Sequence, residues 1–324
     1  MKYAWIWERR EEYSIPMMCD LLSVSRSGLY QSLKRPATGS DDDEKQIVEQ
    51  IRQAQRKHRG RYGRRRMTPE VNEAMGQQVN HKRIGRLMRE HGLGSRKRRP
   101  FRVTTTDSRH DFPIAVNVLD RDFVATAPDQ KWLCDMTYIP TDEGWLYLAL
   151  VIDMFARKLV GWASSDSMPQ ELTIEALQVA LGWRNPGAGL LHHSDRGSQY
   201  AAKDYRKILA ARGITASMSR KGDCWDNAPM ESVNGTLKVE CVHGEHFRTR
   251  EEARQAIIEY IGYYNTERRH SSIGYVPPTQ FERRWRAEIE KRGVSGFLCL
   301  RRWRLVHGGG RRLRRTTAAV GKSG

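Results

Sequence analysis

Three acidic residues lie in local sequence settings suited to binding a divalent metal ion: Asp135, Asp195 and Glu231. Asp135 lies in the strand-like segment 131–140, and Asp195 ends a second such segment, 190–195. Glu231 follows a helix-start pattern that begins at Asp226. Thirty-five residues, 196–230, separate the last two acids. Two strand aspartates and a helix glutamate in a basic chain indicate metal-dependent phosphodiester chemistry.

Transfer of a phosphoryl group between DNA strands needs an activated attacking oxygen and a stabilised leaving oxygen. Two Mg²⁺ ions about 3.5–4 Å apart supply both, and they prefer carboxylate ligands. The sequence predicts two Mg²⁺ ions, for which Mn²⁺ can substitute, held by Asp135, Asp195 and Glu231 with one carboxylate bridging. Each acid also has a structural explanation: a strand residue, a cap, and a first-turn glutamate favoured by the helix dipole. Their coincidence on one fold favours the metal site.

The elements that would position these acids begin at Lys131. Period-two patterns predict three strands joined by short turns, which form an antiparallel meander. A helix after Pro169 and an alternation of strands and helices follow, and this is the element order of an RNase H-like domain. If the first and fourth strands pair, Asp135 lies beside Asp195. The predicted strands are 131–140, 145–155, 158–164, 190–194 and 214–218, and the later helices are 201–212 and 229–241.

Two other residues near the acids in the sequence are further candidates for a role at the site. Lys238 follows Glu231 by two helical turns on the same face, so it is placed to touch phosphate; an exposed surface lysine is the alternative. His193 shares a strand face with Asp195, and a packing or hydrogen-bonding role is favoured over positioning of water or DNA. The loop 222–226 is expected to be flexible and to become ordered on DNA.

Residues 14–36 predict a short helix, a turn and a second helix with Leu29 and Leu33 at helical spacing. Ser25 or Ser27 is the expected cap of the second helix. The pattern resembles a helix-turn-helix. DNA contact and simple packing both explain it, and the sequence leaves both open.

A second helical unit covers residues 41–100. It comprises a helix over 44–58, a helix over 68–76 that begins at Thr68-Pro69, and a helix capped by Asn80 and stopped by Gly92. The last helix has one apolar and one basic face, which favours a DNA-reading helix over a merely solvated surface. Its candidate DNA-binding residues, with those of the preceding segment, are Lys82, Arg83, Arg86, Arg64 and Arg65.

The charge of the chain favours a nucleic-acid partner. Fifty-six Lys and Arg residues stand against 38 Asp and Glu residues, a formal net charge of +18, and such an excess is typical of proteins that bind the phosphate backbone. From Arg283 onward there are 13 basic residues and two glutamates. A protein with only a basic tail is therefore the alternative that charge alone leaves open.

Five scattered cysteines without a Cys-x-x-Cys pair argue against a disulfide framework and a zinc finger, and they predict a cytoplasmic protein. The longest apolar stretch, 145–152, is too short to span a bilayer, so no membrane partner is expected.

Several motifs in one order make the sequence recognisable. From about Glu44 to Glu282 the chain resembles OrfB, the catalytic part of transposases of the bacterial insertion-sequence-three family, relatives of retroviral integrases. The earlier segment 62–84 resembles the second helix-turn-helix of that family. The motifs that carry the resemblance are Trp132-x-x-Asp135-x-Thr137-Tyr138-Ile139, the run 193–200, Asp226-Asn227-Ala228-x-x-Glu231-Ser232, Leu237-Lys238-x-Glu240, Tyr260-Ile261-x-x-Tyr264-Asn265, Arg268 with 270–272, and Pro277-Pro278.

The resemblance implies cleavage at the ends of a mobile element and joining of the freed 3′-hydroxyl to DNA, without a covalent protein–DNA intermediate. Asp135, Asp195 and Glu231 would be the catalytic acids. It also implies a partner, OrfA, usually joined to OrfB by ribosomal frameshifting, which supplies terminal-repeat recognition and a dimerising coiled coil. No such heptad region appears in this sequence. Bringing two element ends together further predicts a homo-oligomer on DNA.

The predicted fold class is α/β: an RNase H-like core with a mixed five-stranded sheet and flanking helices, preceded by small all-α helix-turn-helix units and followed by a basic, disordered tail. The tail after Phe281 departs from the family pattern, and a DNA-binding arm and a read-through of altered sequence both explain it. The predicted boundaries are 1–36 for a helical hairpin, 41–100 for a helix-turn-helix domain, 101–127 for a connector, 128–282 for the catalytic core with a helical extension, and 283–324 for the tail.

Three functions fit these patterns. The first is a metal-dependent transposase that cleaves and joins DNA at the ends of an insertion sequence. The alternative is a catalytically idle, DNA-binding OrfB fragment that regulates or inhibits transposition. A nuclease acting on RNA–DNA hybrids suits the core but not the two helical candidates for DNA binding.

Overall fold

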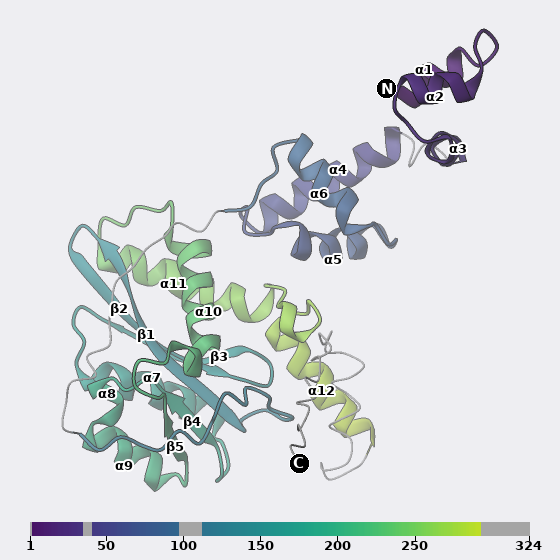
Figure 1. Ribbon diagram of the computed structural model, residues 1–324. Coiled ribbons are helices and arrows are strands. Elements are labelled where there is room, and N and C mark those ends of the chain that lie inside the picture. The colour runs from purple at the N-terminus through teal and green to yellow at the C-terminus, as the bar shows by residue number, and fades with distance from the viewer. Residues whose placement is uncertain (1, 35–40, 97–111, 293–324) are drawn as a thin grey trace, which may run out of the picture. The chain divides into compact units, whose positions relative to one another are not determined.

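The computed structural model of the chain describes residues 2–34, 41–96 and 112–292 (Figure 1). The chain divides into two compact units, Met1–Ser95 and Arg96–Gly324. Within the described ranges, every helix is too short or too polar to cross a membrane.

The first unit opens with three short helices, α1 (Lys2–Glu8), α2 (Ile15–Leu21) and α3 (Arg26–Lys34). The last two confirm the hairpin predicted over 14–36, whereas α1 was not predicted. The Gly28 amide donates to Ser25 Oγ over 3.1 Å, so Ser25 caps α3 as expected. The helices share a small core made of Ile6, Met18, Cys19 and Leu29.

Three longer helices complete this unit: α4 (Asp41–Lys57), α5 (Arg64–Met75) and α6 (His81–Glu90). The predicted cap of α6 is confirmed, because Asn80 Oδ1 accepts the Lys82 amide at 2.8 Å. Gly92 adopts a φ of 65° after the helix, as the predicted stop requires. Apolar residues of all three helices and Tyr62 of the loop between α4 and α5 form one core; its helical members include Ile47, Ile51, Met67, Val71, Ile84 and Leu87.

The predicted start of the middle helix at Thr68-Pro69 was wrong. α5 begins at Arg64, and Pro69 lies inside it. Met67 is fully buried in the core of this group, so packing favours helix well before the proline. Thr68 Oγ1 donates to the Arg64 carbonyl over 2.7 Å rather than capping a helix. Tertiary packing thus outweighs the loss of one backbone hydrogen bond at Pro69.

The second unit is built on a five-stranded mixed sheet with the order β3-β2-β1-β4-β5 (Figure 1). The first three strands pair antiparallel, and β4 joins β1 and β5 in parallel. The predicted meander and the mixed sheet are therefore confirmed. The strands are β1 (Lys131–Thr141), β2 (Gly144–Asp153), β3 (Lys158–Ser165), β4 (Leu191–Ser194) and β5 (Thr215–Met218).

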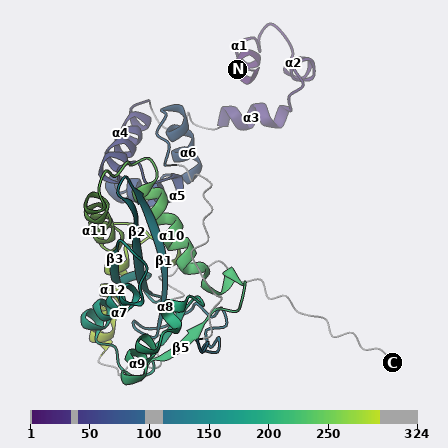
Figure 2. The same cartoon turned by 90° about the vertical axis from the view of Figure 1, so that its left-hand side faces the viewer.

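Helices cover both faces of the sheet (Figures 1 and 2). The alternate β1 residues Trp132 and Cys134 pack in a core with α7 (Gln170–Arg184), α8 (Ser198–Ala201) and α9 (Lys203–Ala211). Leu133 and Ile139 belong to a second core on the other face, shared with α10 and α11. Since strand side chains alternate, Asp135 points to the α10 face. The elements on that side are α10 (Ala228–Leu237), the π-helical η2 (Lys238–Val242) and α11 (Arg250–Thr266), with the 3-10 turn η1 (Cys224–Asn227) preceding α10.

The chain leaves the core through the 3-10 turn η3 (Ser271–Ile273) and α12 (Pro278–Arg292). The predicted tail therefore begins with ten helical residues, 283–292. The helix continues because Trp285 packs edge-on against Phe155, with ring centroids 5.1 Å apart. The remainder of the predicted tail, 293–324, lies outside the described residues.

The described part of the predicted connector, 112–127, packs on the core. Leu119 and Ala125 are buried among the residues of the α10 face. The amides of Val118 and Leu119 both donate to Ser217 Oγ, over 2.9 and 3.1 Å. This segment is therefore part of the catalytic-core unit rather than a loose linker.

Candidate active site

The pairing of β1 with β4 brings two of the predicted acids together. Leu133 lies opposite His193 in this parallel ladder. Asp135 in β1 and Asp195, which directly follows the last residue of β4, each lie two residues later, so they occupy neighbouring positions where the two strands run about 4.8 Å apart. The predicted juxtaposition depended on these strands pairing, and that pairing is confirmed.

Asp135 is a half-buried carboxylate that accepts two hydrogen bonds and is affected by the charges of two other acids. Its Oδ1 accepts the Met136 amide at 2.9 Å, and its Oδ2 accepts the Asn234 side-chain amide at 2.9 Å. Burial raises the pKa of Asp135 well above its usual range, and the charges of Asp195 and Glu231 raise it further. The carboxylates at the end of β4 and on α10 therefore act electrostatically on the carboxylate of Asp135 in β1.

Asp195 and Glu231 also keep the local contacts that their structural explanations predict. Asp195 Oδ1 accepts the Gly197 amide at 2.9 Å, which forms a tight turn after β4. Glu231 is exposed in the first turn of α10, where the helix dipole favours a negative charge. The turn fixes the backbone at Asp195, and the electrostatic effect of both acids on Asp135 remains.

The metal site expected from the sequence can be compared with these positions. Among the residues that the structure describes, no three His, Cys, Asp or Glu side chains lie close enough together to hold one ion. The donors nevertheless fit a divalent cation by type, because Mg²⁺ prefers carboxylate oxygens. They also fit by charge, because a cation would relieve the repulsion that raises the pKa of Asp135. Binding would require these side chains to rotate from their present hydrogen bonds.

α10 contributes a residue whose role the sequence did not indicate. Asn234 lies one turn after Glu231 and is buried. Its amide nitrogen is held by Asp135, while its Oδ1 has no hydrogen-bond partner among the described residues. A buried polar atom without a partner is costly. An asparagine three residues after an acid is not a recognisable sequence motif. Asn234 contacts Asp135 only because α10 packs against β1.

Lys238 lies within electrostatic reach of Asp135. Its ammonium nitrogen is 4.4 Å from the centroid of the Tyr138 ring, an arrangement that stabilises a cation. Burial lowers the pKa of Lys238, and the charge of Asp135 opposes that change. The helix becomes π-helical at this residue. Contact of Lys238 with DNA stays a prediction.

The segment before α10 differs from the flexible loop expected over 222–226. Cys224–Asn227 forms a 3-10 turn. Asp226 is fully buried and accepts hydrogen bonds from Arg121 Nε at 2.9 Å and Arg220 Nη2 at 2.7 Å. These arginines hold the pKa of the Asp226 carboxyl below its usual range. Asn227 Nδ2 then donates to the Cys134 carbonyl over 3.1 Å, which fastens the turn beside Asp135.

The two histidines of β4 have structural contacts. His193 is buried, and its ring nitrogens lie 2.9 and 3.2 Å from the hydroxyls of Ser217 and Ser219. His192 Nε2 lies 3.1 Å from the Tyr205 hydroxyl. Burial lowers the pKa of His193 to about 4 and that of His192 to about 3. The hydrogen-bonding role expected for His193 is therefore confirmed.

The basic residues predicted to bind DNA fall into two sets. Arg83 forms an ion pair with Asp43 over 2.9 Å, and Arg86 pairs with Glu44 and Glu90. The pairs with Asp43 and Glu44 join α6 to α4 across about forty residues of sequence, a separation over which the sequence pattern does not predict contacts. Three other predicted residues, Lys82, Arg64 and Arg65, are exposed.

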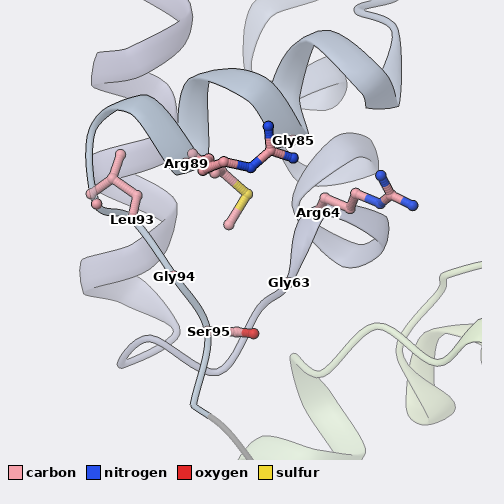
Figure 3. Close-up of a pocket in the computed structure, with 9 residues that line it drawn as sticks. Gly63, Arg64, Gly85, Arg89, Leu93, Gly94 and Ser95 are labelled. Carbon is pink, nitrogen blue, oxygen red and sulfur yellow. The ribbon is translucent and has the colours of Figure 1, made fainter.

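Arg64 also lines a pocket of about 440 Å³ between the start of α5, α6 and the segment 92–95 (Figure 3). Arg89 lines the same pocket (Figure 3), as does Met88. A Cβ added at Gly85 would lie 3.0 Å from Arg64 Cδ, so the two helices approach closely here. The pocket brings two cations to one side of the α4–α6 group.

The sheet, its flanking helices and the preceding helical group define an integrase-core protein with a helix-turn-helix-like domain. The Integrase core domain family matches residues 125–224, a second Integrase core domain family matches residues 212–278, and the HTH-like domain family matches residues 41–101.

Known proteins identify the family. The chain is 44% identical over 269 residues to the insertion element IS600 uncharacterized 31 kDa protein of Shigella sonnei, covering 83% of this chain and 98% of that protein. It is 41% identical over 285 residues to the transposase InsF for insertion sequence IS3A of Escherichia coli strain K12, covering 87% and 98%. The chain belongs to the IS3 family of insertion-sequence transposases, which confirms the resemblance found in its sequence.

Solved structures are also similar. A simian T-cell lymphotropic virus intasome in complex with PP2A regulatory subunit B56 gamma matches with a TM-score of 0.42 and 13% identity, covering 66% of this chain and 70% of that one. The HTLV-2 integrase catalytic core domain in complex with magnesium matches with a TM-score of 0.37 and 15% identity, covering 48% and 97%.

Proposed function

We propose that this transposase cleaves the ends of an insertion sequence and joins the freed 3′-hydroxyl to target DNA, with Asp135, Asp195 and Glu231 as its catalytic and metal-binding residues. The observation that carries the proposal is geometric: Asp135 in β1 lies beside the end of β4, which Asp195 follows directly, and Asn234, one turn after Glu231 on α10, donates to Asp135. Burial raises the pKa of Asp135, and the charges of Asp195 and Glu231 raise it further, which supports the proposal. A cation bound between the acids would offset this concentration of negative charge and allow a DNA phosphate to bind there.

The proposed cofactor is a pair of Mg²⁺ ions, with Mn²⁺ as a substitute. When bound, such ions stabilise charge on the attacking and leaving oxygens of the phosphodiester. Asn234 holds Oδ2 of Asp135 and so restricts the rotation of that carboxylate. Lys238, steadied against the Tyr138 ring, supplies a positive charge beside Asp135 for a DNA phosphate. Both residues come from one helical segment, so α10 positions an acid, an amide and a cation together.

DNA is the proposed substrate and main partner. We assign DNA recognition to residues 41–100 and chemistry to residues 128–282. The proposed DNA contacts are made by Lys238, Lys82, Arg83, Arg86, Arg64 and Arg65. Arg83 and Arg86 would have to exchange their ion pairs with α4 for phosphates. The proposal includes an OrfA partner, assembly of several copies on DNA, and action in the cytoplasm, where the element's DNA lies.

A catalytically idle DNA-binding chain is the second candidate. It is favoured by one observation: the described acids do not form a ready metal-holding group. A strand-transfer assay separates the two. The purified chain, with and without OrfA, is incubated with Mg²⁺ or Mn²⁺ and a duplex that carries the element's terminal inverted repeat.

The proposed function predicts cleavage and joined products that require the metal and disappear in Asp195→Asn. Asp204→Asn is the matched control, because Asp204 is an exposed acid on α9 paired with Lys207. Normal DNA binding without any product, even with OrfA present, would favour the idle chain.

A further inference from the structure

A tryptophan beside the proposed active site has no role in the chemistry described above. Trp225 is 68% exposed, although a side chain of this size is usually well covered. It lies in the 3-10 turn η1, directly before α10. Among the described residues, its indole ring has no aromatic or hydrogen-bonding partner.

The backbone that carries Trp225 is firmly anchored. The Trp225 amide donates to Asp223 Oδ1 over 3.1 Å, and Arg121 forms an ion pair with that aspartate. The next residue, Asp226, is buried and also accepts the Asn117 side-chain amide at 2.9 Å and the Arg220 amide at 2.8 Å. The turn therefore holds the indole out in solvent on a rigid base, and little conformational entropy would be lost when a ligand covers it.

This anchored turn is also fastened to the acidic site. Asn227, two residues after Trp225, donates to the carbonyl of Cys134, the residue before Asp135. Two residues of chain span at most about 7 Å, so the Trp225 backbone lies close to the β1 position of the first acid. Glu231 follows on the helix that the turn starts.

The charges around Trp225 argue against a phosphate-binding role for this surface. Arg121 pairs with Asp223 and Asp226, and Arg220 pairs with Asp226 and Asp120. The cations are thus matched by aspartates and hold the turn together. An aromatic surface in a charge-balanced setting fits the flat face of a nucleobase, and bases of any sequence can stack on it.

We propose that Trp225 is a base-stacking residue that holds a DNA base next to the scissile phosphate during cleavage or joining. This inference rests on the proposed function, because it takes DNA as the molecule that reaches the acids. Terminal base pairs at the element end, or a base displaced there, present the exposed π face that the indole requires.

The test compares three variants of the full chain. Trp225→Ala removes the ring, and Trp225→Phe keeps an aromatic face. Trp183→Ala is the matched control, because Trp183 is 71% exposed but lies on α7, which covers the opposite face of the sheet from α10. Binding is measured to the inverted-repeat duplex with Ca²⁺ in place of Mg²⁺. The same duplex with 5-iodouracil near its terminus is photo-crosslinked, and the attached residue is identified by mass spectrometry.

We expect Trp225→Ala to bind about tenfold more weakly, equivalent to about 1.4 kcal/mol, and to lose the crosslink at position 225. Trp225→Phe and Trp183→Ala should remain within about twofold of the wild type. Thermal unfolding checks that each variant is folded, and if Trp225→Ala is not, the presence or absence of the wild-type crosslink at Trp225 decides the question.

Equal binding and equal crosslinking in Trp225→Ala would overturn the inference. So would loss of self-association without loss of DNA binding, since that result would assign the ring to a protein partner. Joining activity of the wild type is scored separately. A wild type that joins DNA while Trp225→Ala behaves normally rejects only the stacking role. An inactive wild type that still crosslinks through Trp225 rejects only the proposed chemistry.

Discussion

The helical segment formed by α10 and η2 carries two glutamates nine residues apart in opposite environments. Glu231 is exposed, and its charge adds to the burial and the Asp195 charge that raise the pKa of Asp135. Glu240 is buried and accepts hydrogen bonds from Arg268 Nε at 2.7 Å, Arg268 Nη2 at 2.8 Å and the Tyr260 hydroxyl at 3.0 Å. One acid adds to a concentration of negative charge, and the other is neutralised by a dedicated cation. The same residue type therefore serves a site at one end of the segment and the fold at the other.

Glu231→Gln is expected to separate the role of Glu231 in the site from the role of Glu240 in the fold most clearly. We expect DNA joining to fall by at least about a thousandfold, more than the 10- to 100-fold typical of a residue that only supports a metal ligand. The thermal midpoint and DNA affinity should change little, because Glu231 is on the surface. The strand-transfer assay with a parallel binding measurement checks this. A variant that joins DNA at the wild-type rate would remove Glu231 from the site.

Arg268→Ala should produce the reverse pattern. It leaves Glu240 buried without its cation, and breaking a buried ion pair from one side costs about 3–5 kcal/mol. We expect the unfolding transition of the core unit to move to much lower temperature or urea concentration. Arg286→Ala is the matched control: Arg286 is about half exposed and pairs with the buried Glu282, which keeps Arg184 and Lys158 when Arg286 is lost, so we expect a loss of at most about 1 kcal/mol. Equal losses in the two variants would contradict the comparison.

The buried histidines of β4 should make the core sensitive to acid. Their folded-state pKa values of about 3 for His192 and about 4 for His193 lie below the value of about 6.5 for an unfolded histidine. Between these values the unfolded chain binds protons that the folded chain does not, so stability is present above pH 6.5 and is lost as the pH falls toward 4. Each proton contributes a slope of about 1.4 kcal/mol per pH unit.

Urea unfolding at a series of pH values measures this slope. His193→Gln should reduce it by about one proton and leave the dependence between pH 7 and 8 unchanged. A variant with the same acid slope as the wild type would show that His193 titrates normally in the folded protein.

The smallest effect is expected from Lys238→Gln. If the Lys238 ammonium contacts one phosphate, its loss should weaken DNA binding a few-fold and reduce the salt dependence of binding by about one phosphate contact. Binding measured from low to high salt gives that slope. Lys203→Gln, at the start of α9 on the other face of the sheet, is the control. An unchanged salt dependence of DNA binding in Lys238→Gln would mean that the Lys238 ammonium balances the charge of Asp135 and does not contact DNA.

Much of the core could be predicted because it follows from local pattern and from chain connectivity. The short turns between β1, β2 and β3 leave only an antiparallel arrangement, and the alternation that follows leads to parallel strands. Asp135 and Asp195 then become neighbours through backbone register alone. Glu231 could be placed because a helix start precedes it.

What the sequence did not predict depends on side chains that meet across long separations. Asn234 contacts Asp135 only because α10 packs over β1. Arg83 pairs with Asp43 only because α4 and α6 pack together. Pro69 indicated a helix start, but the burial of Met67 extended the helix past it. In each case tertiary packing outweighed the local signal, which is why the candidate acids were easier to predict than their surroundings.

The central claim is that Asp135, Asp195 and Glu231 together bind divalent metal, and calorimetric titration of Mn²⁺ into the chain bound to its inverted-repeat duplex tests it most directly. The account predicts saturable binding in the wild type and in Asp204→Asn. It predicts that binding is lost or at least tenfold weaker in Asp135→Asn, Asp195→Asn and Glu231→Gln. Equal Mn²⁺ binding by the wild type and these three variants would contradict the account.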